Sequence, residues 1–231
     1  MKALKIFKAS IVIGAIFSLV AFATACSASY NLNKDDSVTT KWGTMLQYKI
    51  DKDWEKSSYS INDKSMADED YHNSDDTIFV GLSIDNTNDS SYKYSTTSTY
   101  ADWQDSMERR CTATPTEQAE EYKTTTPQNS SYYDDELADA DCYPTYSDYS
   151  LSEKDPITIN NNKFRIYKLH YKATSSDTAY TEEKENNPNA EQSTACDVAF
   201  ALIKDGTHDI EVSASSEALL KSYLNTLEIK W

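Results

Sequence analysis

Histidine and cysteine most often carry catalysis or bind metals, and this 231-residue chain contains few of either. Its histidines, His72, His170 and His208, each stand alone in their segments, without the paired spacing of a zinc site. The glycines are too widely spaced to form a phosphate-binding loop, and no GxSxG motif of a serine hydrolase is present. The sequence therefore predicts a non-enzymatic protein that needs no cofactor.

Acidic residues offer two weaker patterns. Asp85, Thr87 and Asp89 have the first, third and fifth spacing of a calcium loop. However, Ser90 replaces the turn glycine and Thr96 replaces the bidentate glutamate, so we expect a solvated turn and no metal there. Carboxylate pairs that assemble only in space can form a glycosidase-type site. That arrangement is the basis of an alternative, enzymatic function.

The N-terminal segment is the one part of the chain whose sequence specifies a chemical event. Three lysines within the first eight residues precede an apolar run over 11–22 and then small residues, which is the pattern of a secretory signal. The ending AFATAC resembles the lipobox of bacterial lipoproteins, with Ala23 where that family usually has Leu. The resemblance implies a signal peptide over 1–25 and lipidation, such as palmitate, at Cys26. Secretion with cleavage near Ala25 and an uncleaved membrane anchor are the alternatives.

Three further cysteines would then lie on the oxidising side of the membrane. One bridge and one spare thiol is the simplest arrangement for them. We prefer Cys111 with Cys142, because this pair would tie down the least regular part of the chain. Cys142 with Cys196 is the alternative pairing. Cys196 opens an apolar strand, where a buried cysteine is the simpler expectation than a catalytic thiol.

Net charge and tyrosine content indicate which classes of partner the protein can bind. Removal of the three signal lysines takes the net charge from −16 to −19, and so acidic a surface repels nucleic acid. The chain has 17 tyrosines against six phenylalanines, which suits either a contact surface or half-buried strand positions. The candidate interaction face comprises the tyrosines in and beside an irregular acidic insertion around residues 123–146: Tyr132, Tyr133, Tyr143, Tyr146 and Tyr149.

Periodicity predicts an α+β fold, with helices packed on an antiparallel sheet. Alternating apolar residues predict strands over 46–50, 78–84, 157–159, 164–171, 196–203, 210–212 and 227–231. Capping signals predict helices that begin after Thr99, Thr114 and Ser215 or Ser216. Asp205-Gly206 is the strongest hairpin signal.

Polar segments without a period are expected to be irregular. They include a flexible tether over 26–43, which follows the lipidated cysteine, and acidic loops at 68–70 and 174–192. The remaining chain, residues 44–231, is expected to form one domain.

The predicted order of elements resembles a known type of domain. An opening strand followed by a turn and Trp54, a late meander through 164–171 and 195–212, and the closing LLKSYLNTLEIKW are similar to the PsbP or Mog1 type. Such domains occur in many small bacterial lipoproteins. The resemblance spans residues 44–231 and implies a binding or assembly role, with no shared catalytic residues to transfer.

These observations predict a lipoprotein held at the extracytoplasmic face of the cell membrane. Its expected function is that of a non-catalytic binding or interaction module for a protein or small-molecule ligand. The alternatives are an extracytoplasmic hydrolase that uses spatially assembled carboxylates, and a purely structural or assembly role.

Overall fold

The computed structural model describes residues 30–57, 61–74, 77–90, 92, 97–125, 138–186, 188 and 190–231. The signal peptide expected at 1–25, the lipidation site Cys26, and the tyrosines Tyr132 and Tyr133 lie outside these described residues.

The described chain forms two compact units, each assembled from separate segments. The sheet unit contains residues 30–106, Ser150–Leu169 and Asp197–Trp231, and the helical unit contains Met107–Tyr149 and His170–Cys196. The region expected as one domain, residues 44–231, therefore holds two units. Four continuous secondary-structure elements, one helix and three strands, each contribute residues to both of them.

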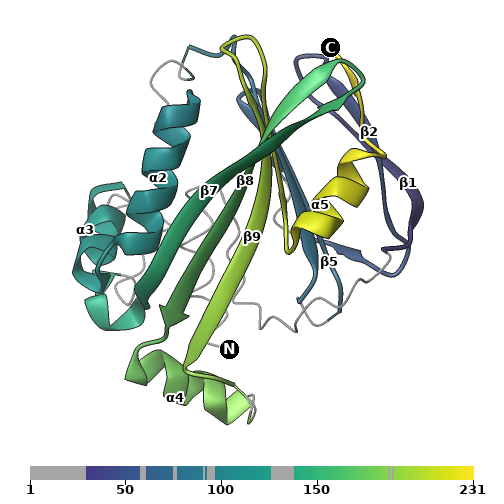
Figure 1. The fold of residues 1–231 in the computed structure, drawn as a ribbon. Helices are drawn as coiled ribbons and strands as arrows, with labels where there is room; N and C mark the ends of the chain where they lie inside the picture. Colours follow the sequence, from purple (N-terminus) through teal and green to yellow (C-terminus); the bar gives the residue numbers. More distant parts are fainter. Residues whose placement is uncertain are drawn as a thin grey trace. The chain divides into compact units, whose positions relative to one another are not determined.

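Two antiparallel sheets carry most of the structure, so the expected α+β class is confirmed (Figure 1). The larger sheet consists of β3 (Glu55–Lys56), β4 (Ile61–Asn62), β5 (Met66–His72), β6 (Phe79–Asp85), β7 (Thr145–Ile159), β8 (Asn162–Thr174), β9 (Ser193–Lys204) and β10 (Asp209–Ala214). Its order is β3-β5-β6-β10-β9-β8-β7, with β4 also paired to β5. The smaller sheet has the order β1-β2-β11, with β1 at Leu32–Thr39, β2 at Met45–Asp51 and β11 at Glu228–Lys230.

The helices of the described chain are α2 (Tyr100–Thr112), α3 (Pro115–Thr125), α4 (Asp177–Asn186) and α5 (Glu217–Leu224), with a 3-10 turn η3 at Ala140–Cys142. Three of these four helices, α2, α3 and α5, begin where the capping signals predict. Thr99 and Asp102 form a capping box, because each backbone N–H donates to the other side chain at 3.1 Å. At α5, the Ser216 hydroxyl accepts a hydrogen bond from the Leu219 N–H at 3.2 Å.

The core of the sheet unit lies on one face of β5, β6 and β10. Val80, Leu82 and Ile84 alternate along β6 and are each at most 2% exposed, and Ile210 and Val212 on β10 are fully buried. Helix α5 contributes buried leucines to the same core, and β1 and β2 contribute further buried side chains. One face of β6 and of β10 is therefore apolar, as the alternation predicted.

Three segments differ from the sequence expectation. Residues 32–39 of the expected tether form β1, which pairs with β2 along its length. Their periodicity is weak because, within this strand, only Val38 is fully buried. The expected acidic loop at 68–70 lies inside β5, and the expected loop at 174–192 contains α4. The prediction of irregular structure was wrong for these segments.

Strand β5 escapes detection because a carboxylate occupies one of its core positions. Glu69 lies between Ala67 and Tyr71 on the core face and is only 7% exposed. The hydroxyls of Tyr48 and Tyr71 donate to its Oε2 at 2.5 and 3.0 Å, and Lys56 Nζ donates to its Oε1 at 2.7 Å. Both oxygens are thus satisfied within the protein, and Tyr48 links the small sheet to the large one.

Candidate functional site

Carboxyl groups gather on the face of β5, β6 and β10 that lies opposite the core. We define the carboxylate face as Asp68, Asp70, Asp85, Asp209 and Glu211. Residues paired across antiparallel strands share a face, as do residues two apart along one strand. By both criteria all five side chains project from the same side of the sheet.

The strand register sets these residues in three rows that cross the strands. Asp85 on β6 pairs with Asp209 on β10, which pairs in turn with Lys204 on β9. In the second row, Ser83 lies between Asp68 and Glu211. In the third row, Gly81 lies between Asp70 and Ser213. Paired side chains are about 5 Å apart at Cβ and successive rows are about 7 Å apart, so the charges form an array instead of converging on one point.

Because Gly81 has no side chain, the side chains of Asp70 and Ser213 in the third row can lie close above its backbone. A Cβ at this position would lie 2.6 Å from Asp70 Oδ1 and 2.6 Å from Ser213 Oγ. The two polar atoms therefore approach the same point above β6 from the strands on either side. Any larger residue would push them apart.

Burial raises the pKa values of carboxyl groups on this face toward neutral pH. Burial, reinforced by the charges of Asp68 and Glu69, raises the pKa of Asp70 to about 8. Burial and the charge of Asp209 raise the pKa of Asp85 to about 7, although Lys204 opposes the shift. Burial also raises the pKa of Asp68. At pH 7 Asp70 is therefore mostly protonated and Asp85 is about half protonated.

The end of the first row is an ion pair within the sheet unit. Lys204 Nζ lies 2.7 Å from Asp209 Oδ1, and both side chains are only 2% exposed. Asp209 Oδ2 has no hydrogen-bond partner among the described residues. Burial raises the pKa of Asp209, and Lys204 and the nearby Tyr92 hydroxyl oppose this shift. Lys204 therefore forms an ion pair with Oδ1 of Asp209, whereas no described residue forms one with Oδ2.

The first turns of helix α2 border the carboxylate face. Trp103 Nε1 donates to Glu211 Oε2 at 2.8 Å, while the Trp103 ring packs on Tyr167 and Phe200 at centroid distances of 5.0 and 5.1 Å. On this side of the sheet, β8 and β9 thus carry an apolar region next to Trp103, and β5, β6 and β10 carry the carboxyl groups. Trp103 contacts both regions.

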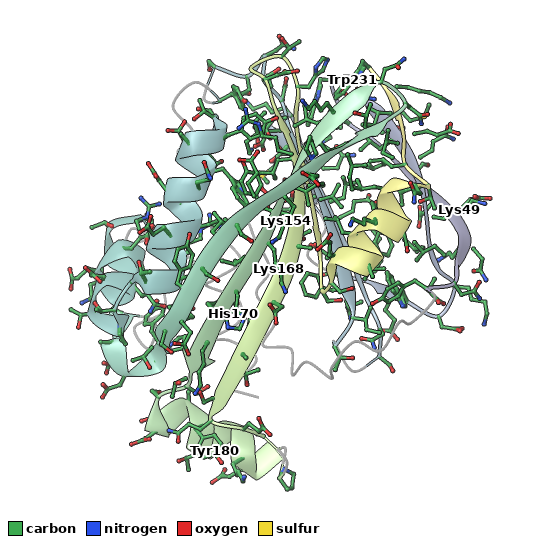
Figure 2. The ribbon with its side chains drawn as sticks, viewed as in Figure 1. Lys49, Lys154, Lys168, His170, Tyr180 and Trp231 are labelled. Carbon is green, nitrogen blue, oxygen red and sulfur yellow. The ribbon has the colours of Figure 1, made fainter. Side chains whose placement is uncertain are left out.

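Positive charge lies near the opposite face of the sheet unit. Lys154 on β7 and Lys168 on β8 belong to neighbouring strands (Figure 2). The pKa of Glu217 on α5 is lowered, first by its hydrogen bond from Lys221 and further by Lys154 and Lys168. The lysines on the side of α5 have acidic neighbours there, since Lys168 Nζ also lies 3.4 Å from Asp197 Oδ1.

The tyrosines expected to form an interaction face have different environments. Tyr146 packs edge-on against Tyr171, with ring centroids 5.7 Å apart, and burial raises its pKa. Tyr143, which follows η3, is also partly buried, and Tyr149 is half-buried on β7. Much of the Tyr146 ring is therefore used for packing inside the helical unit. A contact role for Tyr143 and Tyr149 stays a prediction.

The expected cysteine bridge is absent from this structure, which joins none of the three described cysteines in a disulfide. Cys111 ends the buried face of α2, Cys142 lies in η3, and Cys196 is buried in β9. The Cys111–Cys142 pairing therefore stays a prediction.

Across the described ranges, which do not include Thr96, the calcium-like spacing and the histidines are not arranged as a metal site. Asp85 belongs to the carboxylate face, whereas the Thr87 hydroxyl donates to the Thr207 carbonyl at 2.8 Å. His208 packs against Trp231, with ring centroids 3.7 Å apart, and its Nδ1 lies 3.3 Å from Asp205 Oδ2. Among the residues that the structure describes, no group of three or more His, Cys, Asp or Glu side chains is arranged to hold a metal ion.

Sequence reasoning missed the carboxylate face because its members come from three segments that pair only in the folded sheet. One signal was present, since Asp68 and Asp70 alternate with Ala67, Glu69 and Tyr71. A strand pattern with one charged core residue would have placed both aspartates on a single face.

Comparison with known proteins adds no family to this description. No protein-family model matches the sequence, and no curated protein matches it. Within the described part of the chain, no helix is both long enough and apolar enough to cross a membrane.

Replacement of Asp70 by asparagine tests the burial of its carboxyl group. Because the folded pKa lies above the unfolded value, wild-type stability falls as pH rises from about 4 to 8, whereas the neutral amide of the Asp70→Asn variant carries no such penalty. Relative to wild type, Asp70→Asn should gain on the order of 5 kcal/mol in unfolding free energy between pH 4 and pH 9. Urea denaturation at both pH values measures this. Asp105→Asn, at an exposed helix position, is the matched control; equal behaviour of the two variants would contradict the shift.

Proposed function

We propose that this protein is a lipid-anchored binding module on the extracytoplasmic face of the membrane, and that its carboxylate face binds a cationic group on a partner. The observation that carries the proposal is the array of five acidic side chains on one face of three paired strands. The signal-like N-terminus supports the location, and the net charge of −16 supports a positively charged partner.

The geometry favours an extended cationic ligand. Rows of carboxyl groups about 5 to 7 Å apart match several separate positive charges better than one compact ion. Lysine and arginine side chains of a partner protein, or a polyamine, carry charges at such spacing. The ligand class is therefore a chain of amino or guanidinium groups.

Ligand binding on this face is coupled to proton release. A cation stabilises the ionised form of Asp70 and Asp85 and so lowers both pKa values. At pH 7, where Asp70 and part of Asp85 hold protons, binding must release them. Affinity should therefore rise with pH until both groups are ionised in the free protein.

Titration with a hexalysine peptide tests this surface. We expect its dissociation constant to fall roughly tenfold between pH 6 and pH 8.5, beyond the change that general charge produces. Calorimetry in two buffers of different ionisation enthalpy should show proton release at pH 7. The double variant Asp70→Asn/Asp85→Asn should bind weakly, with little pH dependence.

A charge-matched variant separates this site from non-specific attraction. Asp105→Asn/Asp141→Asn removes the same formal charge from two exposed positions. It should retain the affinity and the pH dependence of wild type. Equal weakening by the two double variants would show that the carboxylate face is not the binding surface.

Replacement of Cys26 tests the proposed attachment to the membrane. Cys26→Ala should abolish metabolic labelling with palmitate and release the protein from membranes, since acyl chains contribute about 0.8 kcal/mol per buried methylene. Labelling and fractionation of cells measure both effects. Retention of the label by the variant would overturn lipidation at this residue.

We also propose that the fold belongs to the PsbP or Mog1 type. Support comes from the order of the last elements, in which the β9–β10 hairpin is followed by α5 and β11. The similarity of the closing LLKSYLNTLEIKW supports the same assignment. It agrees with a binding role, because this type of domain has no common catalytic residues.

A hydrolase is the second candidate function, favoured by the direct pairing of Asp85 with Asp209 across β6 and β10. Two carboxyl groups with different partners can divide the roles of acid and base. Turnover of a glycoside that disappears in Asp85→Asn would support it. A broad substrate screen without turnover would exclude it.

A further inference from the structure

Two buried thiols lie in the helical unit and have no part in the proposed binding site. Cys111, at the C-terminal end of α2, is 3% exposed, and Cys196, near the start of β9, is 4% exposed. They belong to elements that are far apart in sequence.

The pairing of β8 with β9 places Cys196 beside Tyr171. The Ser175 N–H donates to the Gln192 carbonyl at 2.8 Å, and the Thr174 and Ser193 hydroxyls are 2.9 Å apart. Continuation of this antiparallel pairing by three residues on each strand puts Tyr171 opposite Cys196. Cys196 therefore lies on the same side of the sheet as the Tyr171 ring.

Helix α2 brings Cys111 to the same place. Trp103, two turns before Cys111, packs on Phe200, four residues after Cys196, with ring centroids 5.1 Å apart. The eight residues from Trp103 to Cys111 span about 12 Å along the helix axis, and the four residues from Phe200 back to Cys196 span about 13 Å along the strand. The two distances from the Trp103–Phe200 contact are therefore nearly equal. Cys111 and Cys196 thus occupy corresponding positions along the helix and the strand.

The electrostatics of the surrounding tyrosines agree with this placement. Burial raises the pKa of Tyr171, and both Cys196 and Cys111 raise it further. Burial raises the pKa of Tyr146, and the same two thiols contribute. Burial raises the pKa of Cys111 to about 12, and Cys196 adds to this shift. Each thiol is therefore close enough to influence the same two hydroxyls.

In place of the Cys111–Cys142 pairing expected from the sequence, we propose that Cys111 and Cys196 form a disulfide when the chain folds in an oxidising compartment, and that Cys142 is not part of the bridge. The bond would join the end of α2 to β9 over the Tyr146 and Tyr171 rings. The proposal depends on the extracytoplasmic location only for the supply of an oxidant.

The bond can form by two thiol–disulfide exchanges with a small-molecule disulfide. The thiolate of one cysteine attacks the oxidant's S–S bond, forms a mixed disulfide and displaces one small thiolate. The second cysteine then attacks the mixed disulfide at the protein sulfur, forms the protein S–S bond and displaces the other small thiolate. The two protein protons pass to the two displaced thiolates, so the protein is oxidised by two electrons and the oxidant is reduced by two.

We expect the disulfide to form while the chain folds and not after folding is complete. A thiol with a pKa near 12 is almost fully protonated at neutral pH, and only the thiolate attacks disulfides. Burial also excludes the oxidant from Cys111. Folded, reduced protein should therefore oxidise slowly, whereas the unfolded chain should oxidise readily.

Peptide mapping distinguishes the three possible pairings. The full-length chain with Cys26→Ala is refolded from guanidinium in a mixture of reduced and oxidised glutathione, alkylated with N-ethylmaleimide and digested for mass spectrometry. We expect peptides linked through Cys111 and Cys196, with Cys142 alkylated. Linkage of Cys142 to either partner, or alkylation of all three residues, would overturn the proposal.

A second variant tests whether the bond fits the native fold. In the Cys26→Ala/Cys142→Ala chain, oxidation should raise the Tm by roughly 10 °C over the reduced form, because the closed loop is long. Cys111→Ser in the same background should abolish the difference between the two forms. An oxidised form that melts at or below the reduced one would contradict the proposal. Neither outcome depends on lysine-peptide binding, so failure here leaves the binding proposal intact.

Discussion

The register of β6 between β5 and β10 is the constraint on which the sheet unit depends. It assigns Val80, Leu82 and Ile84 to the core face and Gly81, Ser83 and Asp85 to the other. A shift of one residue would move the aspartates into the apolar core and the core residues onto the carboxylate face, so the apolar face fixes the position of every carboxyl group. The acidic array is thus held by the hydrophobic core on the other side of the strands.

Holding carboxyl groups together in this way has an energetic cost. Burial and mutual repulsion favour the neutral form of Asp70 and Asp85, as their raised pKa values show. Lys204 offsets part of this cost for Asp209 through a buried ion pair. Glu69 differs, because two tyrosines and a lysine saturate its oxygens and make it part of the packing. Of the carboxyl groups opposite the core, Asp209 is likewise buried and paired, with Lys204, whereas Asp68, Asp70 and Asp85 are partly exposed.

Local signals in the sequence were sufficient for much of the fold. The Thr99–Asp102 capping box, the turn at Gly206 with a φ of 81°, and the apolar strand β9 depend on residues close together in the chain. Strand β1 gave no such signal, because its residues are mostly polar and it is held by pairing with β2. Strand β5 was obscured by the charged core residue Glu69.

The candidate site could not be read from the sequence for a related reason. Asp85 and Asp209 pair across two strands from distant parts of the chain, so no local spacing relates them. The chain's acidity is visible in its composition, but the concentration of acids on one face depends on long-range register. The proximity of Cys111 and Cys196 similarly depends on the course of α2 along β9.

Proton titration of individual carboxyl groups tests the central claim most directly. In a protein labelled with carbon-13 at the aspartate carboxyl groups, NMR spectra recorded from pH 3 to pH 10 follow each group separately. We predict that Asp70 and Asp85, assigned by the loss of their signals in the Asp70→Asn and Asp85→Asn variants, titrate near pH 8 and pH 7. Titration of both groups near the ordinary aspartate value of about 4 would contradict the account.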